Sequence, residues 1–210
     1  MPKHAFKFPD DVVAAVKRHV AAAVNAISPE RFRQEAQYTT ALVSRLQGTV
    51  YEGREGWVSF DSTVFDDRGR NSAEHRYGAD FAITATISDH QTTVRKAILV
   101  QAKLGRIDRL RKAEADFLRD QLQKMKALTP APKIMQIPEA NGLRTPEMVS
   151  GTRVLNDEPY VPMDLPDYFA ARVLTTLDGC TKPQIVEAVQ DSSLKRVNLI
   201  ANVPSRDWEK

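Results

Sequence analysis

The stretch GADFAITATI at residues 78–87, followed after SDHQTT by VRKAILVQAK at residues 94–103, decides the fold of this chain. Apolar residues alternate along both segments, which is typical of two strands of a β-hairpin. They are Phe81, Ile83, Ala85 and Ile87 in the first segment, and Ile98, Val100 and Ala102 in the second. Burying both sets against one layer requires a register that puts Asp80 on the same side as Gln101 and Lys103. A turn that closes symmetrically on residues 88–91 would set Asp80 opposite Leu99 and diagonal to Gln101.

A second acidic residue, Glu35, is expected to reach the same place from a helix. Ser28-Pro29-Glu30 is a helix start signal, and the helix is predicted to run to Gln47, before Gly48. Glu35 falls in line with the inward stripe of this helix, which includes Phe32, Thr39 and Leu42. A buried carboxylate needs a partner, and a cation shared with Asp80 would provide one.

The remaining chain alternates helix and strand signals without an internal repeat. Helices are expected over residues 10–26, 107–128, 165–174 and 183–190, and strands within 49–65 and over 133–137 and 196–203. Residues 66–77 are expected to form a polar loop, and residues 138–164 to be irregular. Together these elements predict an α/β fold in which a central mixed sheet is flanked by the Glu35 helix on one side and by the 107–128 helix on the other.

Composition sets broad limits on function. With 210 residues and 42% apolar residues, the chain can bury a substantial core, and a net charge of +3 permits a polyanionic partner without requiring one. Its single cysteine, Cys180, excludes an internal disulfide framework. Charged residues interrupt the apolar run at residues 12–27, so no membrane segment is expected and a cytoplasmic location is predicted.

A helix acid, then Gly-x-Asp opening a strand, then Gln-x-Lys ending the next strand resembles the PD-(D/E)xK nuclease superfamily. The Gln-x-Lys variant is similar to the branch that contains Mrr-type restriction enzymes. This resemblance implies a restriction endonuclease-like, three-layer core over residues 28–137. Residues 1–27 would form an N-terminal helical segment, and residues 138–210 an extension of helices and a strand packed on the same domain.

The resemblance also implies a site and a cofactor. Asp80 corresponds to the main metal ligand, Glu35 to the helix-borne acid, Gln101 to a position that is usually acidic, and Lys103 to the essential lysine. Mg²⁺, or Mn²⁺ as a substitute, would be held by Asp80, Glu35 and the amide oxygen of Gln101, with waters and substrate phosphate completing its shell. The expected reaction is hydrolysis of a phosphodiester bond.

The implied substrate is nucleic acid, most readily DNA, and the implied role is defence against foreign DNA, with a second copy or a partner protein providing targeting. Residues 103–126 hold eight basic and four acidic residues, a positive surplus beside the predicted site. Arg106, Arg109 and Lys112 are the candidate phosphate contacts. Glu74 and His75, which shortly precede Asp80, are candidate accessory groups.

Each of these features also has a structural interpretation. An Asp after Gly is a common turn residue, and Gln-Ala-Lys can be a solvated strand edge. Glu35 could pair with Arg31 or another basic residue, and the basic helix could be covered by its own ion pairs. A non-catalytic module that binds nucleic acid or protein while keeping the nuclease fold is therefore the alternative, with Gln101 as a sign of lost chemistry.

Overall fold

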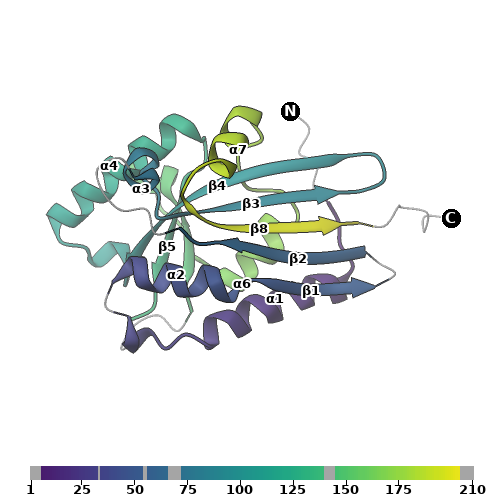
Figure 1. The fold of residues 1–210 in the computed structure, drawn as a ribbon. Coiled ribbons are helices and arrows are strands. Elements are labelled where there is room, and N and C mark those ends of the chain that lie inside the picture. Colours follow the sequence, from purple (N-terminus) through teal and green to yellow (C-terminus); the bar gives the residue numbers. More distant parts are fainter. Residues whose placement is uncertain (1–5, 33, 54–55, 66–71, 140–144, 204–210) are drawn as a thin grey trace.

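The computed structural model describes residues 6–32, 34–53, 56–65, 72–139 and 145–203. Its centre is an eight-stranded mixed sheet with the strand order β1-β2-β8-β3-β4-β5-β6-β7, and Figure 1 shows the long strands lying side by side. The strands are β1 (Gly48–Gly53), β2 (Gly56–Thr63), β3 (Phe81–Ser88), β4 (Thr93–Leu104), β5 (Lys133–Ile137), β6 (Glu147–Ser150), β7 (Met163–Asp164) and β8 (Lys195–Asn202).

The expected hairpin is formed by β3 and β4, which pair antiparallel from Phe81 opposite Val100 to Ser88 opposite Thr93. The predicted register was wrong by two residues, because continuing this pairing sets Asp80 opposite Gln101 instead of Leu99. Asp89 explains the difference: its carboxylate accepts the backbone N–H groups of Gln91 and Thr92, which closes the turn on residues 89–92. A shift of two keeps every side chain on its face, so Asp80 remains beside Gln101.

The last strand, β8, lies in the middle of the sheet. It pairs parallel with β3 and antiparallel with β2, and Figure 1 shows it in yellow between them. Alternate residues from Lys195 to Ala201 are buried. The sheet therefore combines five strands from residues 28–137 with three, β6, β7 and β8, from residues 138–210.

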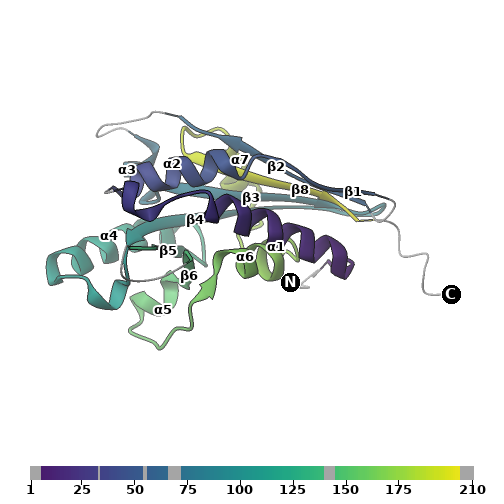
Figure 2. The same cartoon turned by 90° about the horizontal axis from the view of Figure 1, so that it is seen from below.

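Helices cover both faces of the sheet, as the sequence predicted for a mixed α/β fold. On one face α1 (Asp10–Asn25), α2 (Glu35–Arg45) and α6 (Leu165–Tyr168) join a cluster that contains Phe81 and Val100. On the other face α3 (Ala73–Tyr77), α4 (Lys112–Leu128) and α7 (Pro183–Gln190) join a cluster that contains Leu99. Figure 2 shows α1 and α2 running along the long strands. In the described part of the chain, no helix has the length and apolarity needed to span a membrane.

Two helices begin later than predicted. The segment from Pro29 forms only a 3-10 turn, Pro29–Arg31, after which Phe32 is extended and α2 starts at Glu35. The ring of Phe32 meets the ring of Tyr38 edge to face, and this tertiary contact outweighs local helix propensity. The helix expected from Ile107 starts at Lys112, because the Glu114 carboxylate accepts the Arg111 backbone N–H and caps it there.

Two segments expected to lack regular structure contain some. The predicted loop at 66–77 holds α3, with Ser72 accepting the His75 backbone N–H as its N-cap, while residues 66–71 lie outside the described part. Residues 138–164 contain β6, α5 (Gly151–Leu155) and β7, and residues 140–144 are not described. These elements are too short for periodicity to identify. The helix predicted at 165–174 is α6 followed by a π-helical turn, Phe169–Val173.

Gly78 should be the least replaceable residue of the segment that leads into β3. Its φ of +70° is left-handed, and a Cβ atom there would lie 2.6 Å from the backbone carbonyl oxygen of Gln121 in α4. Gly78→Ala should therefore lower the free energy of unfolding by about 2 kcal/mol or more, measured by urea denaturation. Gly53→Ala, at an exposed position without positive φ, is the matched control, and equal effects of the two changes would contradict this account.

Candidate active site

Asp80 is fixed to β4 by hydrogen bonds across the hairpin. Its backbone N–H donates to the Val100 carbonyl oxygen at 2.9 Å. Its carboxylate atom Oδ2 accepts the Ala102 backbone N–H at 2.7 Å and the side-chain amide of Gln101. Oδ1 makes no hydrogen bond to any described residue. The carboxylate is thus held at the end of the hairpin with one oxygen still available.

Glu35 reaches the same end of β4 from the first turn of α2. Its Oε2 accepts from Lys103 Nζ at 3.0 Å, and its Oε1 accepts the Leu104 backbone N–H at 3.1 Å. The Lys103 side chain is 11% exposed and that of Glu35 33% exposed. The expected ion pair of Glu35 is therefore formed, but its partner is Lys103 and not Arg31.

These side chains face one cleft of about 840 Å³. Glu35, Asp80 and Lys103 all line it, together with the loop after β4 and the first half of α4. Glu35 and Asp80 come from opposite sides of the sheet edge, yet no layer of core side chains separates them. The structure brings together three of the four residues that the sequence assigned to catalysis.

Burial raises the pKa of Asp80 to about 7, from an ordinary value of 3.8. The Ala102 N–H and the charge of Lys103 lower this pKa, whereas the nearby acids Glu35 and Glu74 raise it. Desolvation and like charge thus outweigh the favourable contacts. An additional positive charge beside Asp80 would relieve both effects.

Gln101 is placed differently from the other predicted site residues. It is 1% exposed and does not line the cleft. Its amide nitrogen donates to Asp80 and to the Ala102 carbonyl oxygen, while its Oε1 is buried without a hydrogen-bond partner. In this arrangement Gln101 positions the carboxylate of Asp80, and its oxygen is turned away from the cleft.

The two predicted accessory groups, Glu74 and His75, have different surroundings. Glu74 pairs with Lys195 at the start of β8, and it is close enough to Asp80 to raise the pKa of that residue. His75 is exposed. Its backbone N–H donates to the Ser72 hydroxyl, and its carbonyl oxygen accepts from Lys124 Nζ. Lys195 has no signal in the sequence, because nothing local indicates that β8 lies beside β3.

The three candidate phosphate contacts also differ. Arg106 and Arg109 line the cleft, whereas Lys112, the first residue of α4, does not. Arg106 is held by Asp108 through three side-chain hydrogen bonds of 2.9, 3.1 and 3.3 Å. Arg109 has no side-chain partner among the described residues. Ion pairs of Arg111 with Glu114 and Arg119 with Asp157 show that part of the basic surplus is neutralised locally.

The residues present fit a divalent cation bound mainly through carboxylate. Mg²⁺ prefers oxygen ligands and usually keeps several waters, so one or two protein carboxylates are enough. Asp80 offers a free oxygen in a cleft where its charge is destabilised, and Glu35 lies beside it. Within the described ranges, no group of three or more His, Cys, Asp or Glu side chains is arranged to hold a metal. Any ion here would therefore rely on waters and substrate for the rest of its shell.

Two further residues that line the cleft were not predicted from the sequence. Glu139 follows β5, and because β4 and β5 are parallel, their carboxyl ends meet at the same edge of the sheet. This topology is the signal that could have identified it. Phe117, 60% exposed on α4, also lines the cleft. Gly105 approaches the Glu139 carboxylate closely, with a φ of +72° that favours glycine.

Comparisons with protein-family models, with curated proteins and with solved structures find no match for this chain. The site must therefore be interpreted from its own geometry.

Asp80 should make the protein less stable as the pH rises from about 4 to about 7. In this window the folded state retains a proton on Asp80 that the unfolded chain has released, so the free energy of unfolding falls with pH. The loss is at most about 4 kcal/mol. Asp80→Asn should remove this part of the decline, measured by urea denaturation in EDTA from pH 4 to 8.

The exposed Asp61 in β2 provides the control, because Asp61→Asn should retain the wild-type pH dependence. Parallel stability curves for wild type and Asp80→Asn would contradict the raised pKa of Asp80.

Proposed function

We propose that this protein is a magnesium-dependent nuclease that hydrolyses phosphodiester bonds in DNA. The observation that carries the proposal is the convergence of Glu35, Asp80 and Lys103 on one cleft at the end of the β3–β4 hairpin. A carboxylate pair can hold a metal ion, and an adjacent lysine can orient water or offset charge on the phosphate, so this set of groups suits phosphodiester hydrolysis. The same proposal includes a restriction endonuclease-like fold and a role in defence against foreign DNA. It also includes action as a homo-oligomer or with a targeting partner.

In this mechanism each side chain has a distinct task. Asp80 and Glu35 would hold Mg²⁺ or Mn²⁺, which when bound polarises the phosphate and lowers the pKa of a coordinated water. Lys103 has three N–H donors, so it can keep its contact with Glu35 and still donate to the attacking water or to a phosphate oxygen. Gln101 keeps Asp80 in place, and Arg109 offers an unpaired guanidinium for the substrate backbone.

A non-catalytic nucleic-acid-binding module is the second candidate, and specific contacts favour it. Both oxygens of Glu35 are already hydrogen-bonded, and the Gln101 oxygen does not reach the cleft. Such a protein would use Lys103 and Arg109 to bind phosphates without cleaving them. Cleavage and binding assays separate the two candidates.

Cleavage of plasmid DNA should require both the metal and Lys103. The wild-type protein with Mg²⁺ or Mn²⁺ should nick or linearise plasmid, and EDTA should stop the reaction. Lys103→Ala and Asp80→Ala should each reduce the rate by about 100-fold or more, because the first removes the cation beside the reacting phosphate and the second removes a metal ligand. Lys126→Ala, an exposed change at the far end of α4, should leave the rate unchanged.

Circular dichroism of every variant would confirm that the fold is kept. If no condition gives metal-dependent cleavage that is sensitive to Lys103, the enzyme proposal is wrong. DNA binding with strong salt dependence in that same preparation would instead support the binding module.

Arg109 should contribute more to DNA binding than Arg106, although both line the cleft. Arg106 is already neutralised by Asp108, whereas Arg109 is free to pair with a phosphate. In fluorescence anisotropy with labelled duplex DNA and EDTA, Arg109→Ala should weaken binding and reduce the slope of log K against log[salt] by about 1. Arg106→Ala should change the slope less, and the reverse order would argue against this path for the DNA.

A further inference from the structure

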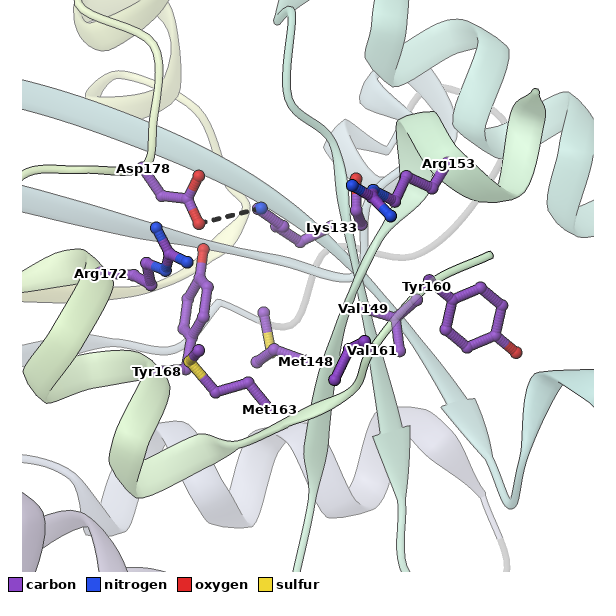
Figure 3. Close-up of a pocket in the computed structure, with 11 residues that line it drawn as sticks. Lys133, Met148, Val149, Arg153, Tyr160, Val161, Met163, Tyr168, Arg172 and Asp178 are labelled. Carbon is purple, nitrogen blue, oxygen red and sulfur yellow. Dashed lines mark ion pairs between the residues drawn. The ribbon is translucent and has the colours of Figure 1, made fainter. Parts of the chain in front are cut away.

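A second cavity, of about 320 Å³, lies apart from the candidate active site and shares no lining residue with it. It is formed by the start of β5, by β6, and by side chains from residues 153–178, as Figure 3 shows. Its volume is at the lower end of the range for small-molecule pockets. The cavity is therefore suited to a compact ligand and not to a polymer.

The charged groups around this cavity are mainly positive. Lys133, Arg153 and Arg172 line it, with Asp178 as the acidic residue of the lining. Lys133 Nζ pairs with Asp178 at 2.9 Å, and both side chains are largely buried. The guanidinium of Arg172 makes no ion pair or hydrogen bond with a described residue. Arg153 donates one N–H to the Pro159 carbonyl oxygen at 2.6 Å, which leaves its other donors available. The lining thus has an excess of two positive charges.

A buried hydroxyl group among these charges is poorly partnered. Tyr168 is 3% exposed, and its hydroxyl lacks a hydrogen bond of good geometry, although the Asp178 carboxylate lies close enough to interact with it. Lys133 Nζ lies 5.7 Å from the centre of its ring. Figure 3 shows the hydroxyl beside Arg172 and the Lys133–Asp178 pair. Burial raises the pKa of Tyr168, so the hydroxyl stays protonated and can act as a donor. A buried donor without a well-formed hydrogen bond is costly, and a ligand acceptor would satisfy it.

The remaining walls are apolar or aromatic. Met148 and Met163 form part of the lining, and Tyr160 lies at its edge on the side away from Arg172. Val161 is 86% exposed at the rim, where an uncovered aliphatic side chain has no packing role. These surfaces can contact the uncharged part of a ligand whose charged part faces the cations.

We propose that this pocket binds a small phosphomonoester with an apolar or planar body, of about the size of a mononucleotide. A phosphomonoester carries close to two negative charges at neutral pH and three acceptor oxygens, which matches the excess charge of the lining. The planar guanidinium of Arg172 can donate two parallel N–H groups to such a phosphate. This proposal does not depend on nuclease activity.

Isothermal titration calorimetry with adenosine 5′-monophosphate as the probe tests the proposal on the full chain. The mononucleotide should bind, and more tightly than either adenosine or inorganic phosphate, because each of these lacks one half of the ligand. Arg172→Gln, at an exposed position where folding should be unaffected, should weaken binding by about tenfold or more. Arg18→Gln on α1, outside the pocket, should not.

A second variant checks the buried hydroxyl. Tyr168→Phe keeps the ring and removes a poorly partnered donor, so it should weaken mononucleotide binding while changing the free energy of unfolding little. A merely structural tyrosine would lose stability instead.

Three results would overturn the proposal. The first is no detectable binding of the mononucleotide up to about 10 mM, a concentration well above that expected for a specific site. The second is equal affinity for adenosine. The third is binding that Lys103→Ala abolishes and Arg172→Gln leaves intact, which would place the nucleotide in the cleft at Asp80.

Discussion

The pairing of Asp80 with the end of β4 is the constraint on which the candidate site depends. The Ala102 N–H holds the carboxylate, and the Asp80 N–H holds the Val100 carbonyl, so the hairpin register itself sets the position of the acid. Gly78 then allows the chain to turn closely past α4 before the strand begins. Because both faces of β3 and β4 pack in a core cluster, a slip of one residue would move their side chains into the opposite core layer, where they would not fit. The energy of core burial therefore maintains the geometry of the site.

Charge pairing around Asp80 follows a simple pattern. Glu35 pairs with Lys103 on the β4 side, and Glu74 pairs with Lys195 on the β8 side. Asp80 lies near both pairs without a basic partner in direct contact among the described residues, so burial raises its pKa. A buried acid left with uncompensated charge lowers stability, and such groups persist where function requires them. The pattern makes Asp80 the position where a cation would bring the greatest gain.

Strong local patterns were predictable from the sequence, and long-range placement was not. Alternation along residues 81–87 and 98–102 fixed the hairpin faces, and Pro and Gly signals located α7 and the ends of several elements. The side chain of Asp89 sets the turn, and the apolar periodicity carries no information about this contact. The predicted register therefore differs from the observed one by two residues. The insertion of β8 between β2 and β3 depends on the global packing of two layers. For the same reason Lys195 and Glu139, which reach the site region only through sheet topology, could not be found from motifs.

Gln101 can be understood from the charge balance of the site. An acidic side chain at this buried position would add a negative charge against Asp80, whose pKa is already raised by Glu35 and Glu74. The amide avoids that repulsion and donates a hydrogen bond to Asp80. Glutamine also offers no anionic ligand, which weakens the attraction for a divalent ion. The Gln101 amide nitrogen donates to Asp80, and this orientation leaves the amide oxygen buried without a hydrogen-bond partner among the described residues. A site built in this way would bind metal most strongly when substrate phosphate supplies the missing negative charge, so metal and substrate binding should be coupled.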